Sequence, residues 1–211
     1  KTRFLYNPEL NSRWFVVPGL VVIILAILSI LLTALTVARE WENGSMELLL
    51  STPATPIEII IGKLAPYVAL GLTAVASVYI ISRLFLGVPF RGSHLVFLVG
   101  CFLFLLTCLS LGLLISVLTR DQRMAMQISL IVGMLPSILL SGFIFPIESM
   151  VPFFQFVTTI LPARWFMNIC RDSFLKGPDL VAQQTSFIAL LLMSSLLVMM
   201  ASKTFKKDVE P

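Results

Sequence analysis

Long apolar stretches alternate with short polar segments along the whole chain. Five stretches contain no charged residue, and they run over 15–38, 64–82, 95–119, 124–147 and 180–202. A helix needs about 20 apolar residues to cross about 30 Å of hydrocarbon. A membrane β-barrel would instead show alternating strands of about ten residues. The pattern therefore predicts an all-α integral membrane protein with five transmembrane helices.

Composition agrees with this class. Of the residues, 58% are hydrophobic and 12% are charged, and the mean hydropathy is +0.99. Soluble domains carry about 25% charged residues. Of the 15 Lys and Arg residues, eight fall on the predicted side of the N-terminus and seven on the other, so their count does not decide the orientation. The clusters at span ends favour a cytoplasmic C-terminus, and they are Arg120 with Arg123, and Lys203 with Lys206 and Lys207.

The chain begins at Lys1 with a polar approach and without the pattern of a signal peptide. We therefore expect a piece of a longer protein whose first part is missing. Five spans would place the two ends of this piece on opposite sides of the membrane.

Few groups capable of chemistry lie in the predicted spans. An ionisable side chain at a helix centre costs at least about 2.5–3.5 kcal/mol, and ion-coupled transporters usually keep such groups. Here Glu58 and Lys63 lie at one interface and Arg83 at the other. The sequence Gly62-Lys63 lacks the other residues of a phosphate-binding loop, and His94 is the only histidine. We expect no catalysis by this chain and an energy source outside the bilayer.

The cysteines and the net charge point to no ligand. Cys101, Cys108 and Cys170 lack metal-binding spacing and are expected to be small buried side chains. A net charge of +4 gives no indication of nucleic acid. We expect no cofactor and no metal on this chain.

The polar segment between the first two spans contains acidic residues, a turn motif and a short helix, more than a simple loop between spans needs. It carries four of the eleven acidic residues of the chain, and an Asn43-Gly44-Ser45 turn leads into a short Leu-rich helix that Pro53 stops. Such a helix would lie across the membrane surface, where another subunit could bind it. We call residues 39–65 the elbow.

The entry to the second span begins with a helix-start signal. Thr55 can cap, proline suits the first helical position, and Glu58 completes a capping box. Pro66 removes the hydrogen bond to the carbonyl of Gly62, which favours a bend there. We predict an interfacial helix over 56–65 that bends into the span at Pro66, with Lys63 also at the hinge. An ordinary proline kink is the alternative.

The elbow resembles the signature of the permeases of type-2 ABC exporters. The matching residues read Arg39-Glu40-x-Glu42-x-Gly44-Ser45-Met46-Glu47-x-Leu49-Leu50-x-Thr52-Pro53, followed by Glu58, Gly62-Lys63 and Pro66-Tyr67. Relatives usually have Thr where Ser45 stands, and Trp41 occupies a position that is often charged. The resemblance implies a coupling helix that sits in a groove of a cytoplasmic ATPase subunit. The implied coupling residues are Arg39, Glu40, Glu42, Gly44, Ser45, Met46, Glu47, Leu48 and Leu49.

Later segments also resemble this family, in Ser141–Met150 and in Pro162-x-Arg164-Trp165-Phe166. Members of this family begin with a further membrane helix and a large external domain, and we expect both to be absent from this piece. The resemblance implies two ABC ATPase subunits that hold ATP and Mg, a second permease copy (identical or related), and as a further partner a periplasmic adaptor protein. It also implies the bacterial inner membrane, with an external N-terminus and a cytoplasmic elbow and C-terminus.

These inferences give one order of segments. The predicted order is an external approach 1–14, a span 15–38, the elbow 39–65, a span 66–86, an external loop 87–94, a span 95–119, a cytoplasmic loop 120–123, a span 124–145, an external hairpin and amphipathic helix 146–179, a span 180–202, and a cytoplasmic tail 203–211.

The segment 146–162 is predicted to be a re-entrant hairpin. Its apolar core, 151–161, is about half as long as a span, and prolines interrupt it. Irregular backbone at membrane depth is tolerated only against protein or a water-filled cavity, so the hairpin should line the outer mouth of a pathway. If it crossed the membrane, both chain ends would share one side. The external gate residues are Phe145, Pro146, Glu148, Pro152, Phe153, Phe154 and Pro162.

The segment 164–174 is amphipathic, with Arg164 and Arg171 on one face and Trp165 on the other. We expect a helix that lies flat in the external interface, as a gate or as a passive anchor. On the first span, small residues could form a dimer seam or could pack within the bundle, and they are Ala26, Ser29, Thr33 and Ala34.

Together these features predict the permease subunit of an ATP-driven exporter of a drug-like or lipid-like substrate. A channel or secondary transporter that works alone is one alternative, and it would need polar ligands at mid-depth. A membrane anchor for a peripheral protein is another, and it would not need a broken external hairpin.

Overall fold

The computed structural model describes residues 12–53, 55–85, 87–176 and 180–207, and in these ranges the regular structure is all helical. Five helices are long and apolar enough to cross a membrane. They are α1 (Ser12–Glu42), α3 (Pro56–Leu84), α4 (His94–Thr119), α5 (Gln122–Leu135), which continues as the π-helix η1 (Pro136–Leu140), and α8 (Leu180–Lys207). The predicted all-α membrane fold with five spans is confirmed.

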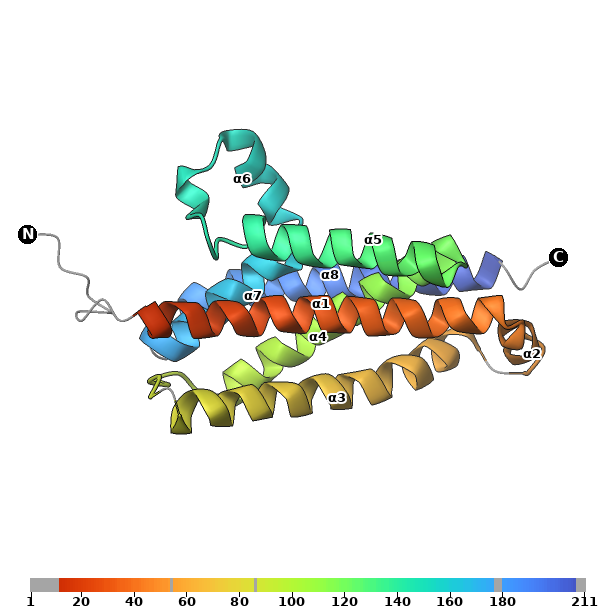
Figure 1. The fold of residues 1–211 in the computed structure, drawn as a ribbon, viewed down its shortest axis with the longest axis horizontal. Helices are drawn as coiled ribbons and strands as arrows, with labels where there is room; N and C mark the ends of the chain where they lie inside the picture. Colours follow the sequence, from red (N-terminus) through yellow and green to blue (C-terminus); the bar gives the residue numbers. More distant parts are fainter. Residues whose placement is uncertain (1–11, 54, 86, 177–179, 208–211) are drawn as a thin grey trace, which may run out of the picture.

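Short helices cap the two ends of the bundle (Figure 1). One end carries α2 (Ser45–Leu50), and we call it the elbow end. The other, the hairpin end, carries the 3-10 helix η2 (Ile147–Ser149) and α6 (Pro152–Thr159), which project sideways from the bundle. Along the chain, α6 is followed by α7 (Pro162–Arg171) and the π-helix η3 (Asp172–Lys176), which precede α8.

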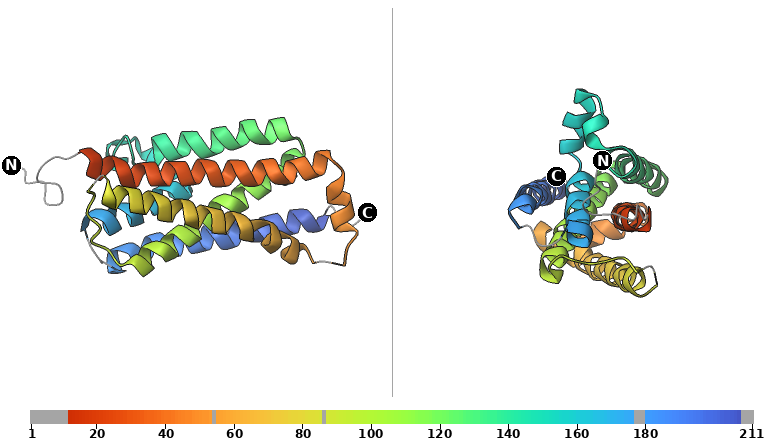
Figure 2. Two further views of the ribbon diagram at one scale, coloured as in Figure 1. Left: turned by 60° about the horizontal axis from the view of Figure 1, so that its bottom comes forward. Right: turned by 90° about the vertical axis from the view of Figure 1, so that its left-hand side faces the viewer.

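Two helices form the centre of the bundle. In α1 and α4, 56% and 61% of the most apolar window is buried, against 17% in α3 and 22% in each of α5 and α8. The helix α1 packs on both α4 and α5, and α4 also packs on α8. Helices α5 and α3 flank α1 on opposite sides (Figures 1 and 2). The outer helices therefore present most of their apolar surface outward, as spans that face hydrocarbon must.

The small residues of α1 pack inside this single chain. Ala26, Ser29, Thr33 and Ala34 are all buried. Beside them, a Cβ placed on Gly112 of α4 would lie 2.4 Å from the carbonyl oxygen of Ile30. The two backbones thus approach more closely than any side chain would allow. Packing within the bundle explains these residues, and the dimer-seam interpretation is wrong for them.

The helix α3 contains both predicted pieces of the second span. It runs from Pro56 through Pro66 to Leu84 as one element, so the interfacial helix and the span are continuous. A proline leaves only local hydrogen bonds unmade, and the turns on both sides can keep theirs. Whether Pro66 acts as a hinge stays a prediction.

The close approach of α1 and α4 predicts a sensitive position. Gly112→Ala should push the helices apart and destabilise the protein by about 1–3 kcal/mol, with a fall in apparent Tm of about 2–12 °C. The measurement is thermal unfolding of the detergent-purified protein.

Gly62→Ala is the matched control, because Gly62 also lies within a helix but has nothing within 4 Å of its Cβ position. It should leave the apparent Tm unchanged or raise it slightly, since alanine favours helix over glycine. Equal Tm values for the two variants would contradict the close packing of α1 on α4.

Candidate functional site

The elbow reverses the chain through a glycine turn at the end of α1. Gly44 has φ 70°, a conformation that favours glycine, and its N–H donates to the carbonyl of Trp41 at 3.1 Å. The hydroxyl of Ser45 donates to the carbonyl of Glu40 at 3.2 Å. These bonds satisfy carbonyls that the helix end would otherwise leave without partners. The predicted Asn-Gly-Ser turn therefore ends α1 and starts α2.

The short helix α2 is held to the bundle by one face and exposed on the other. Met46 is fully buried, and Leu49 packs against the apolar core. Leu48 points outward and is 73% exposed, and Ser45 is also exposed. Glu47 lies in α2, but its side chain is outside the described residues. An exposed leucine on an anchored surface helix is a suitable contact for another protein.

The predicted capping box at the start of α3 is present. The N–H of Thr55 donates to Glu58 Oε2 at 2.8 Å, and the N–H of Glu58 donates to Thr55 Oγ1 at 3.4 Å. This reciprocal pair satisfies two donors at the helix start. It fixes the residue at which α3 begins, and hence the length of the segment that links it to α2.

An ion pair joins the two helices of the elbow. Lys63 Nζ of α3 donates to Glu40 Oε2 of α1, and both side chains are partly buried. About one turn further into the same two helices, the hydroxyls of Thr36 and Tyr67 share a hydrogen bond. Lys63, a hinge candidate, thus lies at a contact between helices, whereas Gly62 beside it has open space around it.

A second set of contacts joins the elbow to the turn between α4 and α5. Glu42 Oε1 accepts the backbone N–H of Gln122 at 2.7 Å. The guanidinium of Arg120 lies 4.6 Å from the ring centroid of Trp41, a cation–π contact. Arg120 has φ 52°, which costs about 1–2 kcal/mol for a residue other than glycine. The strained turn therefore places a cation over the ring of Trp41.

The sequence identified the acidic residues of the elbow as candidates, but it did not identify the residues of this chain that they contact. Glu40 and Glu42 were expected to serve a partner, but both carboxylates bind groups of this chain. Trp41 had no assigned role, and Arg120 and Gln122 were not candidates. Their sequence signal was weak, because a polar turn between two spans is expected in any membrane protein. Of the expected coupling residues, the exposed ones are Arg39, Glu42, Gly44, Ser45 and Leu48.

At the opposite end, α5 and η1 stop short of the predicted span. The span was expected to reach 145, but the helix ends at Leu140, and Gly142 turns the chain with φ 83°. Beyond it the hairpin exposes Phe145, Phe153 and Phe154.

A cavity of about 410 Å³ lies between η1 and the hairpin. It is lined by Leu139, Leu140, Phe145, Ser149, Met150, Val151 and Phe154. Phe145 and Phe154 are thus the gate candidates that the structure brings together. Glu148, Pro146 and Pro152 are exposed, and Phe153 packs edge-on against Phe154 with ring centroids 5.6 Å apart.

The expectation of a flat external helix after the hairpin is wrong. The helix α7 runs obliquely within the bundle, against α1, α4 and α8 (Figures 1 and 2). Phe166 is fully buried and stacks on Phe104 of α4 with ring centroids 4.2 Å apart. Met167 and Ile169 are fully buried as well. The apolar face therefore packs against protein instead of lipid.

The arginines on the polar face of α7 are half-buried, and they bind the hairpin and the turn that leads into it. Arg164 Nη1 donates to the carbonyl of Gln155 at 3.0 Å and to Thr158 Oγ1 at 2.6 Å. Arg171 Nη2 donates to the carbonyl of Gly142 at 2.7 Å. Trp165 Nε1 donates to the carbonyl of Thr159 at 2.9 Å. All three candidates thus tether the segment that leaves α5 and returns through α6.

The described residues contain five helices able to span a membrane, and an anchored surface helix, α2, connects α1 to α3. This arrangement defines a multi-pass helical membrane protein. Comparison with known sequences identifies the family. The chain belongs to the family described as ABC-2 family transporter protein, which it matches over residues 1–203.

Relatives carry names of the same kind. The chain is 48% identical over 177 residues to "Probable multidrug ABC transporter permease YbhS" of Escherichia coli (strain K12), which covers 84% of this chain and 47% of the relative. It is 36% identical over 204 residues to "Probable multidrug ABC transporter permease YbhR" of the same organism, over 97% and 55%. "Inner membrane transport permease YhhJ", also from that organism, is 29% identical over 213 residues, over 99% and 56%. The chain spans about half the length of these curated relatives.

The tether between α7 and α6 predicts a local effect. Arg164→Met should remove both hydrogen bonds to α6 and speed amide hydrogen exchange at residues 155–160 by about ten-fold or more, since a bond from a charged donor contributes about 1.5–3 kcal/mol. The measurement is hydrogen exchange by mass spectrometry. Arg123→Met, an exposed arginine at the elbow end, is the control and should leave these amides unchanged. Identical exchange in both variants would show that Arg164 does not hold the hairpin.

Proposed function

We propose that this chain is the membrane part of a permease subunit in an ATP-driven exporter, and that α2 is its coupling helix. One observation carries the proposal. The helix α2 is anchored by the buried Met46 and presents the exposed Leu48, while Glu40 and Glu42 on the preceding turn bind α3 and the α4–α5 turn. A force applied to the outer face of α2 would therefore reach three of the spans.

The energy would come from a separate subunit. The charge-free stretches of the five spans contain no Asp, Glu, Lys, Arg or His on which an ion or proton gradient could act. In the proposed mechanism two ABC ATPase subunits bind ATP and Mg, close on each other, and move the two elbows. Each bundle then rotates as a packed unit, which is an interface motion without chemistry on this chain. The chain itself carries no cofactor in this scheme.

The proposed cargo is hydrophobic or amphipathic, of a drug-like or lipid-like kind. The cavity beside the hairpin, about 410 Å³, falls within the roughly 300–1,000 Å³ of sites for drug-sized ligands, and its lining is mostly apolar. Two relatives are named multidrug permeases. The hairpin, held by Arg164 and Arg171, would act as the external gate above such a cargo.

The assembly would contain a second permease copy, identical or related, with the elbow end in the cytoplasm and the hairpin end outside. A bacterial inner membrane suits this arrangement, since one relative is named an inner membrane permease. A periplasmic adaptor protein would complete a route across the cell envelope.

The exposed leucine of α2 gives the test. Leu48→Lys should lower substrate-stimulated ATP hydrolysis and export by about ten-fold or more with the fold intact, because it places a charge in an apolar contact. The measurements are ATPase activity and efflux from vesicles that contain the whole transporter.

Leu84→Lys provides a matched control, because Leu84 is 74% exposed at the far end of α3, where a lysine can reach the interface. It should leave both activities near the starting level. Full activity in Leu48→Lys would exclude α2 as the coupling helix.

A further inference from the structure

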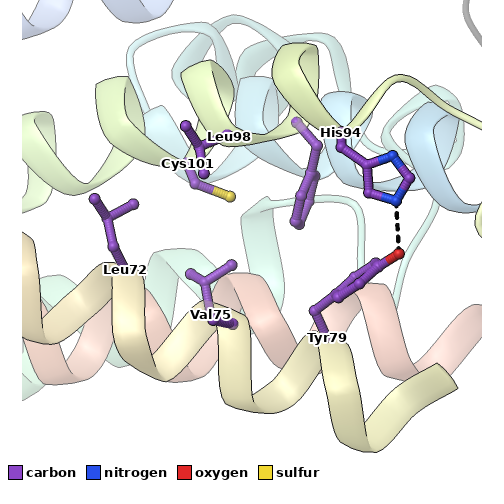
Figure 3. A pocket seen from close by; sticks show the side chains of 8 residues that line it. Leu72, Val75, Tyr79, His94, Leu98 and Cys101 are labelled. Carbon is purple, nitrogen blue, oxygen red and sulfur yellow. Dashed lines mark hydrogen bonds between the residues drawn. The ribbon is translucent and has the colours of Figure 1, made fainter. Parts of the chain in front are cut away.

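A narrow apolar groove lies between α3 and α4 near the hairpin end, away from the cavity assigned to the cargo. Figure 3 shows Leu72 and Val75 of α3 facing Leu98 and Cys101 of α4, with Tyr79 and His94 at one end. The groove has a volume of about 160 Å³. This is well below the roughly 300–1,000 Å³ of sites for drug-sized ligands. It has room for part of a slender chain and not for a whole drug-like molecule.

The groove has a closed floor and an open side. Val75, Phe97 and Cys101 are buried at its floor. Leu98 on its rim is 58% exposed, and Ala76 is exposed as well. The open side lies on helices that expose apolar side chains along their length, so it faces hydrocarbon when the protein is in a membrane. The hydrocarbon tails of lipids are the slender apolar chains available there.

The end of the groove nearest the α3–α4 turn is polar and fixed. The hydroxyl of Tyr79 and Nε2 of His94 share a hydrogen bond of 2.8 Å (Figure 3). Phe90 holds both rings, with its centroid 5.2 Å from that of Tyr79 and 4.7 Å from that of His94. One turn beyond, Arg83 Nη1 donates to the Tyr79 hydroxyl at 3.4 Å.

This rim carries positive charge that the described residues do not neutralise. Arg83 is exposed, and within the described part of the chain no carboxylate lies within ion-pair distance of it. Arg91 on the adjoining turn is also exposed. A basic side chain at the end of a span lies at the level of lipid headgroups, where it attracts anionic ones.

We propose that this groove binds one acyl chain of an anionic phospholipid, whose phosphate contacts Arg83 at the rim. The apolar slot takes the upper part of the chain, and the Tyr79–His94 pair lies beside the glycerol region. Such a lipid would fill the space between α3, the least buried of the spans, and α4 at the centre. The proposal requires only that the protein sits in a membrane, so it stands apart from the transport proposal.

Lipid photolabelling tests the site. The full-length protein is placed in phosphatidylcholine nanodiscs that contain a small amount of phosphatidylglycerol with a diazirine in one acyl chain, and labelled peptides are mapped by mass spectrometry. We expect labelling within 72–79 and 94–101, about five-fold stronger than with phosphatidylcholine carrying the same group, as expected for about 1 kcal/mol per basic side chain. Arg83→Gln should bring the two lipids to equal labelling without a change in fold, since that side chain is exposed.

Two alanines on α3 make a matched pair. Ala76→Phe should fill the groove and abolish the labelling, whereas Ala69→Phe, at an exposed position outside the groove, should leave it unchanged. Equal labelling of wild-type protein by the two lipids would overturn the proposal. So would unchanged labelling in Ala76→Phe, or an unlabelled groove in the wild type, as a protein partner covering it would produce.

Discussion

The ion pair between Glu40 and Lys63 joins the last turns of α1 to the beginning of α3, at the point where both helices leave the apolar part of the bundle. An exposed pair is worth about 0.2–1 kcal/mol, so its contribution to stability is small even with partial burial. Its position matters more than its energy. It closes the base of the elbow, so that α2 and its linker form a loop with fixed ends. The contact of Glu42 with Gln122 fixes this loop to α5 as well.

At each end of the bundle, a short helical segment is held to the core helices by polar contacts, but the groups involved differ. At the elbow end, carboxylates bind a lysine and a backbone N–H. At the hairpin end, Arg164 binds the backbone carbonyl of Gln155 in α6, and Arg171 binds that of Gly142 in the turn after η1. Both arrangements attach a short helical element at one end of the bundle to the core helices, with its charged anchoring groups paired. A movement at one end could therefore reach the other through α1, which contacts α2, α3, α4, α5 and α7.

Sequence patterns predicted the elements well and their contacts less well. The five spans followed from charge-free stretches, and the start of α3 followed from Thr55 and Glu58, because these signals are local. The position of α7 did not follow, because an amphipathic stripe looks the same whether its polar face meets water or a hairpin of the same chain. Gly112 and Trp41 show the same limit. Their roles depend on Ile30 and Arg120, which are far away in the sequence.

If the elbow passes force to the bundle through the Glu40–Lys63 pair, as we propose, exchanging the two charges in the whole transporter should reveal it. Export driven by ATP is measured for Glu40→Lys, for Lys63→Glu, and for the double exchange. Each single change places like charges together and should lower export relative to the unchanged protein at equal expression. The double exchange should restore most of it, as a coupling energy between the two sites requires. Export in the double variant no better than in the single ones, or single variants with full export, would contradict the account.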